Sequence, residues 1–110
     1  MKLQKIVENL ELKPLTKTED KEIEGVFISD MLSDVMSSAK AGDLWVTVQT
    51  HKNIVSASNL VDIGAIIIVH GKSVPDETIE IANRFHVSIY STSLSTFQLA
   101  GKLVALGLNP

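Results

Sequence analysis

The 110-residue sequence contains no cysteine, which excludes disulfides, thiolate nucleophiles and cysteine-ligated zinc or iron–sulfur sites. Its longest unbroken apolar run has five residues, 65–69, whereas a membrane-spanning helix needs about 20. The formal net charge is −3, so the chain has no excess of positive charge that would attract nucleic acid or anionic lipid. The first residues include no apolar stretch of the kind that signal peptides carry. These absences predict a cytoplasmic globular protein without nucleic-acid or membrane partners.

Apolar residues make up 45% of the chain, an ordinary fraction for a protein with a packed core. From Gly25 onward, short apolar runs alternate with segments of helical periodicity. The expected strands are 26–28, 44–48, 65–69 and 87–90, with a helix after each. This alternation predicts an α/β fold with three layers, α/β/α, in which helices cover both faces of a mainly parallel sheet of about four to five strands. The order of the strands stays open.

The first part of the chain has a different composition, rich in lysine and acidic residues. Apolar residues at helical spacing predict a helix over 3–10, and the stretch 12–15 is compatible with an edge strand that tolerates Pro14. A charged connection, 17–24, follows. We therefore expect one domain over 1–110, in which the helix and connection of 1–24 precede the repeating strand–helix units of 25–110.

Local signals predict how the helices begin. Ser29 or Asp30 is expected to cap the helix after the first parallel strand, and Thr50 the next one. The stretch 95–98 fits a capping box that opens the last helix. The spacing of apolar residues in the preceding helix predicts that Phe85 is buried.

Open parallel sheets bind ligands at the carboxyl ends of their strands, where helix N-termini also offer free backbone N–H groups to anions. We therefore searched the segments that follow the four expected strands. The candidate ligand-binding residues are Asp30, Thr50, His51, Asn53, His70, Gly71, Lys72, Ser91 and Thr92.

The same residues also have structural explanations. Hydroxyl and amide side chains in such loops commonly act as helix caps. His51 and His70 are stronger candidates for a functional role because a histidine is not needed for capping. His86 is expected to have a structural role, near the negative end of a helix dipole.

Catalytic signatures are largely missing. Gly71-Lys72-Ser73 resembles the end of a P-loop, but Ile66 occupies the position of the required first glycine. No G-x-S-x-G or G-x-G-x-x-G motif is present. His51 and His70 have no carboxylate pair nearby in sequence, so no metal site and no catalytic residue are predicted.

The last helix carries more apolar residues than one buried stripe requires, which indicates a second partner. We therefore predict a homodimer that forms through the C-terminal helix, with Leu99, Leu103 and Leu106 in the contact.

Three segments carry a resemblance to a known family: Leu44–Ile54 (LWVTVQTHKNI), Gly64–Ala82 (GAIIIVHGKSVPDETIEIA) and Val87–Phe97 (VSIYSTSLSTF). Together they resemble a DRTGG domain, a family similar to the N-terminal domain of HPr kinase/phosphorylase. Where the family has Asp-Arg, this chain has Thr50-His51, and where the family has Thr-Gly-Gly, this chain has Val69-His70-Gly71. The resemblance implies a three-layer α/β/α fold and a regulatory, usually dimeric, ligand-sensing module.

Some relatives carry the label of an HPr serine kinase or of an iron–sulfur hydrogenase component. This chain has no P-loop domain and no cysteine, so neither a kinase nor a cysteine-ligated cluster fits it, and no cofactor is predicted. The leading hypothesis is a non-catalytic, homodimeric regulatory module that binds a small anionic metabolite or nucleotide. The alternatives are a small or metal-dependent enzyme that uses His51 and His70, and an assembly subunit without a ligand.

Overall fold

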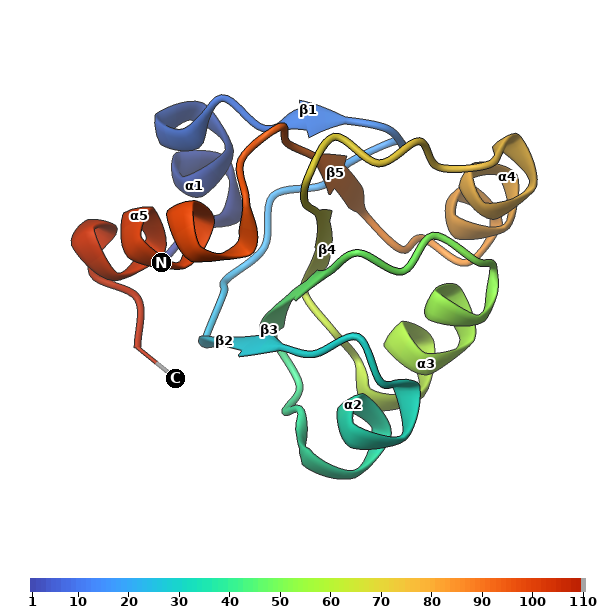
Figure 1. The fold of residues 1–110 in the computed structure, drawn as a ribbon. Coiled ribbons are helices and arrows are strands. Elements are labelled where there is room, and N and C mark those ends of the chain that lie inside the picture. The colour runs from blue at the N-terminus through green and yellow to red at the C-terminus, as the bar shows by residue number, and fades with distance from the viewer. Residues whose placement is uncertain (110) are drawn as a thin grey trace.

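The structure is a computed structural model that describes residues 1–109. It shows a three-layer α/β/α arrangement in which a five-stranded, mostly parallel sheet lies between two groups of helices (Figure 1), and the predicted fold class is confirmed. The strands are β1 (Lys13–Pro14), β2 (Gly25–Ile28), β3 (Asp43–Thr47), β4 (Ala65–Ile68) and β5 (Ile89–Ser91). The helices are α1 (Leu3–Leu10), α2 (Leu32–Ser38), α3 (Asn53–Val61), α4 (Asp76–Arg84) and α5 (Thr96–Leu106).

The strands lie in the order β1-β5-β4-β3-β2. The four strands from β2 to β5 are parallel to one another, and each is hydrogen-bonded to the next one along the chain. β1 is the exception, because it pairs with β5 in the antiparallel direction. The sheet therefore ends in β1 at one edge and in β2 at the other.

Each face of the sheet has its own apolar core. On one face α1 and α5 contribute Leu3, Ile6, Leu99 and Leu103, which pack with Ile67 and other alternate residues of the strands. On the other face residues of α2, α3 and α4 pack with Trp45, Ile66 and Ile68. Consecutive residues of a strand point to opposite faces, and β4 is buried on both, as its run of β-branched residues predicts.

The helix starts confirm one sequence prediction and correct two. Ser95 caps α5 in a full capping box with Gln98, as predicted. The predictions that Ser29 or Asp30 caps α2 and that Thr50 caps α3 were wrong. The N-cap positions of those helices are Met31 and Lys52, and neither side chain accepts a capping hydrogen bond.

Burial differs from expectation at three apolar positions. Phe85 is 51% exposed, because α4 ends at Arg84 and the chain turns before Phe85 can reach the core. Leu99 and Leu103 are 0% and 1% exposed. The prediction that these two leucines contact a second subunit was therefore wrong, since they fill the core of their own chain. Within residues 1–109, no helix has the length and apolar character required to cross a membrane.

Candidate functional site

The topology separates two neighbouring strand ends and creates a crevice between them. After β4 the chain passes to α4 on one face of the sheet, whereas after β5 it passes to α5 on the opposite face (Figure 1). A point where adjacent connections leave in opposite directions is where open α/β sheets bind ligands. The carboxyl ends of β4 and β5 are therefore the place to look for a site.

The two loops that follow these strands are held together by backbone hydrogen bonds. The N–H of His70 donates to the carbonyl of Leu94 at 2.8 Å, and the N–H of Gly71 donates to the carbonyl of Thr92 at 2.9 Å. His70 and Gly71 both have positive φ, 63° and 61°, which is the backbone geometry of a type I′ turn. Gly71 adopts this conformation without strain, and the turn directs the following residue, Lys72, toward the crevice.

β1 supplies a third wall. Because β1 is antiparallel to β5, Lys13 lies opposite Ser91 at the carboxyl end of β5. The end of α1 lies at the same place, and its C-cap residue Glu11 has the left-handed conformation, with φ 53°. Segments at the two ends of the sequence thus meet at one edge of the sheet.

These walls line a partly open cavity of about 790 Å³. Of residues 1–109, three lysines line it, Lys13, Lys72 and Lys102, and Glu11 is the only acidic residue that does. Serine and threonine side chains of the loops after β4 and β5 add hydroxyl groups. The cavity therefore combines an excess of positive charge with hydrogen-bonding groups, which suits an anionic ligand.

Apolar side chains form another part of the lining. They come from four segments of the chain: Leu10, Leu15, Val74, Ile79 and Leu94. All five are partly buried. A ligand with an uncharged portion could contact these side chains while its charged groups remain near the lysines.

Helix N-termini contribute less to the site than the sequence predicts. The first turn of α4 contains Asp76 and Glu77, whose negative charges disfavour a bound anion there. At α5 the N–H of Gln98 already donates to Ser95 Oγ. The positive charge of the cavity therefore comes from lysine side chains and not from free backbone amides.

Four of the predicted ligand-binding residues line the cavity: Gly71, Lys72, Ser91 and Thr92. Sequence reasoning missed Lys13 and Lys102, because their positions depend on the strand order and on the packing of α5. One signal for Lys102 was present: it is the only lysine, arginine, aspartate or glutamate after Arg84.

Asp30 has a structural role at the carboxyl ends of β2 and β3. One oxygen of its carboxylate accepts hydrogen bonds from Thr47 Oγ1 and from the N–H of Val48, both at 2.9 Å. The side chain of Gln49 donates to the backbone carbonyl of Asp30 at 3.1 Å. These contacts join the two strand ends, and Asp30 does not line the cavity.

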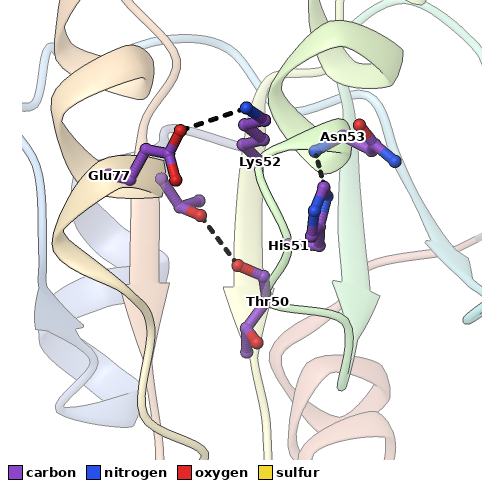
Figure 2. A network of polar contacts seen from close by, with 6 residues as sticks. Thr50, His51, Lys52, Asn53 and Glu77 are labelled. Atoms are coloured by element: carbon purple, nitrogen blue, oxygen red, sulfur yellow. Dashed lines mark hydrogen bonds and ion pairs between the residues drawn. The ribbon is translucent and has the colours of Figure 1, made fainter.

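Thr50, His51 and Asn53 lie together at the start of α3, beside α4 and outside the cavity (Figure 2). His51 Nδ1 accepts a hydrogen bond of 3.2 Å from the N–H of Asn53, so this histidine satisfies a helix N-terminal amide. The premise that a histidine is not needed for capping was therefore wrong at this position. The carbonyl of Thr50 accepts a hydrogen bond from Thr78 Oγ1, and Lys52 pairs with Glu77 at 3.1 Å, which connects α3 to α4.

His70 is exposed in the turn after β4 but does not line the cavity. The structure thus places neither His51 nor His70 in the cavity. Among residues 1–109, no group of three or more histidine, aspartate or glutamate side chains is arranged to hold a metal ion.

Tyr90 lies in β5 next to the cavity residue Ser91 and is 1% exposed, but it does not line the cavity. Burial raises the pKa of its phenol above 10.0; a hydrogen bond with Thr18 lowers the pKa, and the negative charge of Asp20 raises it. The phenol is therefore neutral at physiological pH and belongs to the core that α1 and α5 cover.

Comparison with protein families identifies the chain over most of its length. The model of the DRTGG domain matches residues 5–106. The chain belongs to the DRTGG domain family. No curated protein sequence matches this DRTGG domain.

A solved structure has a similar fold. It is the crystal structure of the CBS and DRTGG domains of the regulatory region of Clostridium perfringens pyrophosphatase, complexed with the activator diadenosine tetraphosphate. The TM-score is 0.70 at 16% sequence identity, and the similarity covers 93% of this DRTGG domain. It covers 45% of the crystallised regulatory-region chain, so this domain spans less than half of that chain's length.

Proposed function

We propose that this DRTGG domain is a regulatory, ligand-sensing module that binds a small phosphorylated metabolite of the nucleotide class in the cavity between β4 and β5. The observation that carries this proposal is the convergence of Lys13, Lys72 and Lys102 from three separate segments on one cavity. A volume of about 790 Å³ lies within the usual range for small-molecule sites, roughly 300–1,000 Å³.

The division of the lining supports a ligand with two parts. Phosphate groups would lie near the lysines, and the less polar part would contact the side chains around Leu10 and Ile79. The similar pyrophosphatase region was crystallised with a nucleotide activator, which supports the same ligand class for a fold of this kind.

Thermal unfolding in the presence of nucleotides and phosphorylated metabolites tests the proposal. A ligand at 100 times its dissociation constant stabilises the folded chain by about 2.7 kcal/mol. In a domain of this size that corresponds to a rise in Tm of about 10 °C. The alternative of an assembly subunit without a ligand predicts no shift with any compound.

Matched lysine variants locate the site. Lys102→Ala is expected to reduce the ligand-induced shift, because it removes one of the cavity's three positive charges. Lys40→Ala is the control, since Lys40 is exposed and does not line the cavity. Equal shifts in both variants would refute binding at this cavity.

The alternative of an enzyme that uses His51 and His70 has less support, because neither histidine lines the cavity and Nδ1 of His51 is engaged at the start of α3. His51→Ala and His70→Ala are accordingly expected to leave the ligand-induced shift unchanged. A loss of the shift in both variants would favour the histidine site.

We also propose that the domain forms a homodimer. Leu106 is the one predicted contact residue that is not fully buried. Because Leu99 and Leu103 are buried, exposed side chains on α5 or elsewhere must supply most of the contact.

A further inference from the structure

One edge of the sheet is left without protection. β2 is the last strand in the order of the sheet, and its four residues, Gly25–Ile28, include no charged residue and no proline (Figure 1). The opposite edge strand, β1, has only two residues, Lys13 and Pro14. Short edge strands, lysine and proline are common means of preventing edge pairing, and β2 has none of them.

The backbone of β2 has groups directed outward. The N–H of Ser29 donates to the carbonyl of Val46 in β3 at 3.2 Å. Peptide groups alternate in direction along a strand, so the N–H and carbonyl groups of Val26 and Ile28 point away from β3. Within residues 1–109 these groups have no other hydrogen-bonding partner, so they can pair with another strand.

Among residues 1–109, no charged side chain lines a groove beside this edge. It has a volume of about 160 Å³ and lies between β2 and α5, with Val26, Ile28 and Val104 in its lining. Val104 is 69% exposed and Phe97, on the same helix, is 88% exposed. The free edge therefore adjoins an apolar stripe of α5 that its own chain does not cover.

We propose that a second copy of this chain covers this surface by antiparallel pairing of β2 with β2 of the partner subunit, while the stripe of α5 packs alongside. The inference rests on the homodimer proposed above and does not depend on the ligand. A two-fold axis at Phe27 places Val26 opposite Ile28 of the partner subunit, so that the outward groups of both residues pair. The two sheets then join into one.

The charge of the surface favours a second copy as the occupant. In a two-fold contact the same patch lies on both sides, and residues near the axis lie close to their own copies. A charged strand would repel itself there, but Gly25–Ile28 and the groove lining within residues 1–109 carry no charge. The acidic residues that flank the strand, Glu24 and Asp30, lie opposite each other across the axis in this register, and their like charges confine the pairing to the neutral segment between them.

The area required explains why α5 takes part. A standard interface buries about 800 Å² on each partner, and the whole chain exposes 5995 Å². A strand of four residues cannot supply that area by itself. The exposed side chains of Phe97, Val104 and Met31, which is 59% exposed, are available to extend the contact.

Sedimentation velocity over a wide range of concentrations provides the first test. The full chain is expected to form a dimer, and Ile28→Lys is expected to raise the dimer dissociation constant at least roughly tenfold, because it places an ammonium group against an apolar partner surface. Leu60→Lys is the matched control: Leu60 is 70% exposed on α3, which covers the other face of the sheet.

A monomer at every concentration would overturn the inference, as would equal effects of Ile28→Lys and Leu60→Lys. Loss of the dimer in Ile28→Lys alone supports it. The shift in Tm with the nucleotides and phosphorylated metabolites named above is measured on the same Ile28→Lys protein. It tests the ligand proposal separately from the dimer, because the cavity lies at β4 and β5.

The absence of cysteine allows a second test by disulfide trapping. Residues opposite each other at a non-hydrogen-bonded position of an antiparallel pair have Cα atoms about 4.5 Å apart, within the disulfide range of about 4.4–6.8 Å. Phe27→Cys is therefore expected to form a covalent dimer under mild oxidation, whereas Leu60→Cys is not. A failure of Phe27→Cys to cross-link while the chain remains a folded dimer would refute pairing centred on Phe27.

Discussion

Asp30→Ala distinguishes a structural role of this carboxylate from a role in ligand binding. The carboxylate accepts two hydrogen bonds of 2.9 Å, from Thr47 Oγ1 and from the N–H of Val48. Hydrogen bonds to charged groups contribute about 1.5–3 kcal/mol each, and the lower value applies here because Asp30 is exposed to solvent. Thr47 is only 2% exposed, so its hydroxyl would lose its acceptor inside the protein. We expect a loss of about 2 kcal/mol in the free energy of unfolding.

Urea denaturation measures this loss directly, and a thermal scan should show a Tm lower by about 8 °C. Asp34→Ala is the control, an exposed acidic residue of α2, and we expect a change within about 0.5 kcal/mol. The ligand-induced shift in Tm should be the same in Asp30→Ala and in the unmodified chain, because Asp30 does not line the cavity. Unchanged stability together with a lost ligand shift would refute the structural role.

Four further predictions follow from local structure. Ser95→Ala removes the capping box of α5 and should cost about 1 kcal/mol in urea denaturation. Gly101→Ala should stabilise the chain by about 0.5–1 kcal/mol, since an added Cβ in this helix meets nothing within 4 Å. Gly64→Ala should destabilise it by about 1–3 kcal/mol, because the added Cβ would lie 2.6 Å from Ile23 Cδ1. The pKa of Tyr90 is raised in the folded chain, so as the pH rises the phenol ionises first in the unfolded chain. The free energy of unfolding should therefore fall as the pH rises above 10.0. Unfolding experiments over a series of pH values should show that Tyr90→Phe removes this part of the loss.

The sequence predicted the sheet well because each strand–helix unit carries its own periodicity. The helix over 3–10 and the capping box at 95–98 were both confirmed. Strand order could not be predicted, since apolar runs such as 65–69 do not specify their neighbours. For the same reason the sequence does not reveal that the strand 26–28 lies at the edge of the sheet, where Ile28 is 46% exposed.

The candidate site shows the same limit. Gly71, Lys72, Ser91 and Thr92 could be placed at one edge because they follow two strands that turned out to be neighbours. Lys13 could not, because its position depends on an antiparallel pairing that no local pattern reveals. Asp30 and His51 were predicted to bind a ligand because the sequence does not show that their side chains are already hydrogen-bonded within the protein. Those hydrogen-bonding partners become known only in three dimensions.

The pairing of β1 with β5 has a consequence for how the chain folds. Each of the three parallel pairings joins strands that are adjacent along the chain, whereas Lys13 and Ser91 are separated by 78 positions. Closing the longer loop costs about 1 kcal/mol more in chain entropy. We expect the four parallel strands to form the folding nucleus and β1 with α1 to dock last. In hydrogen exchange β1 should then open while β3 and β4 stay protected, and each opening would remove one wall of the cavity.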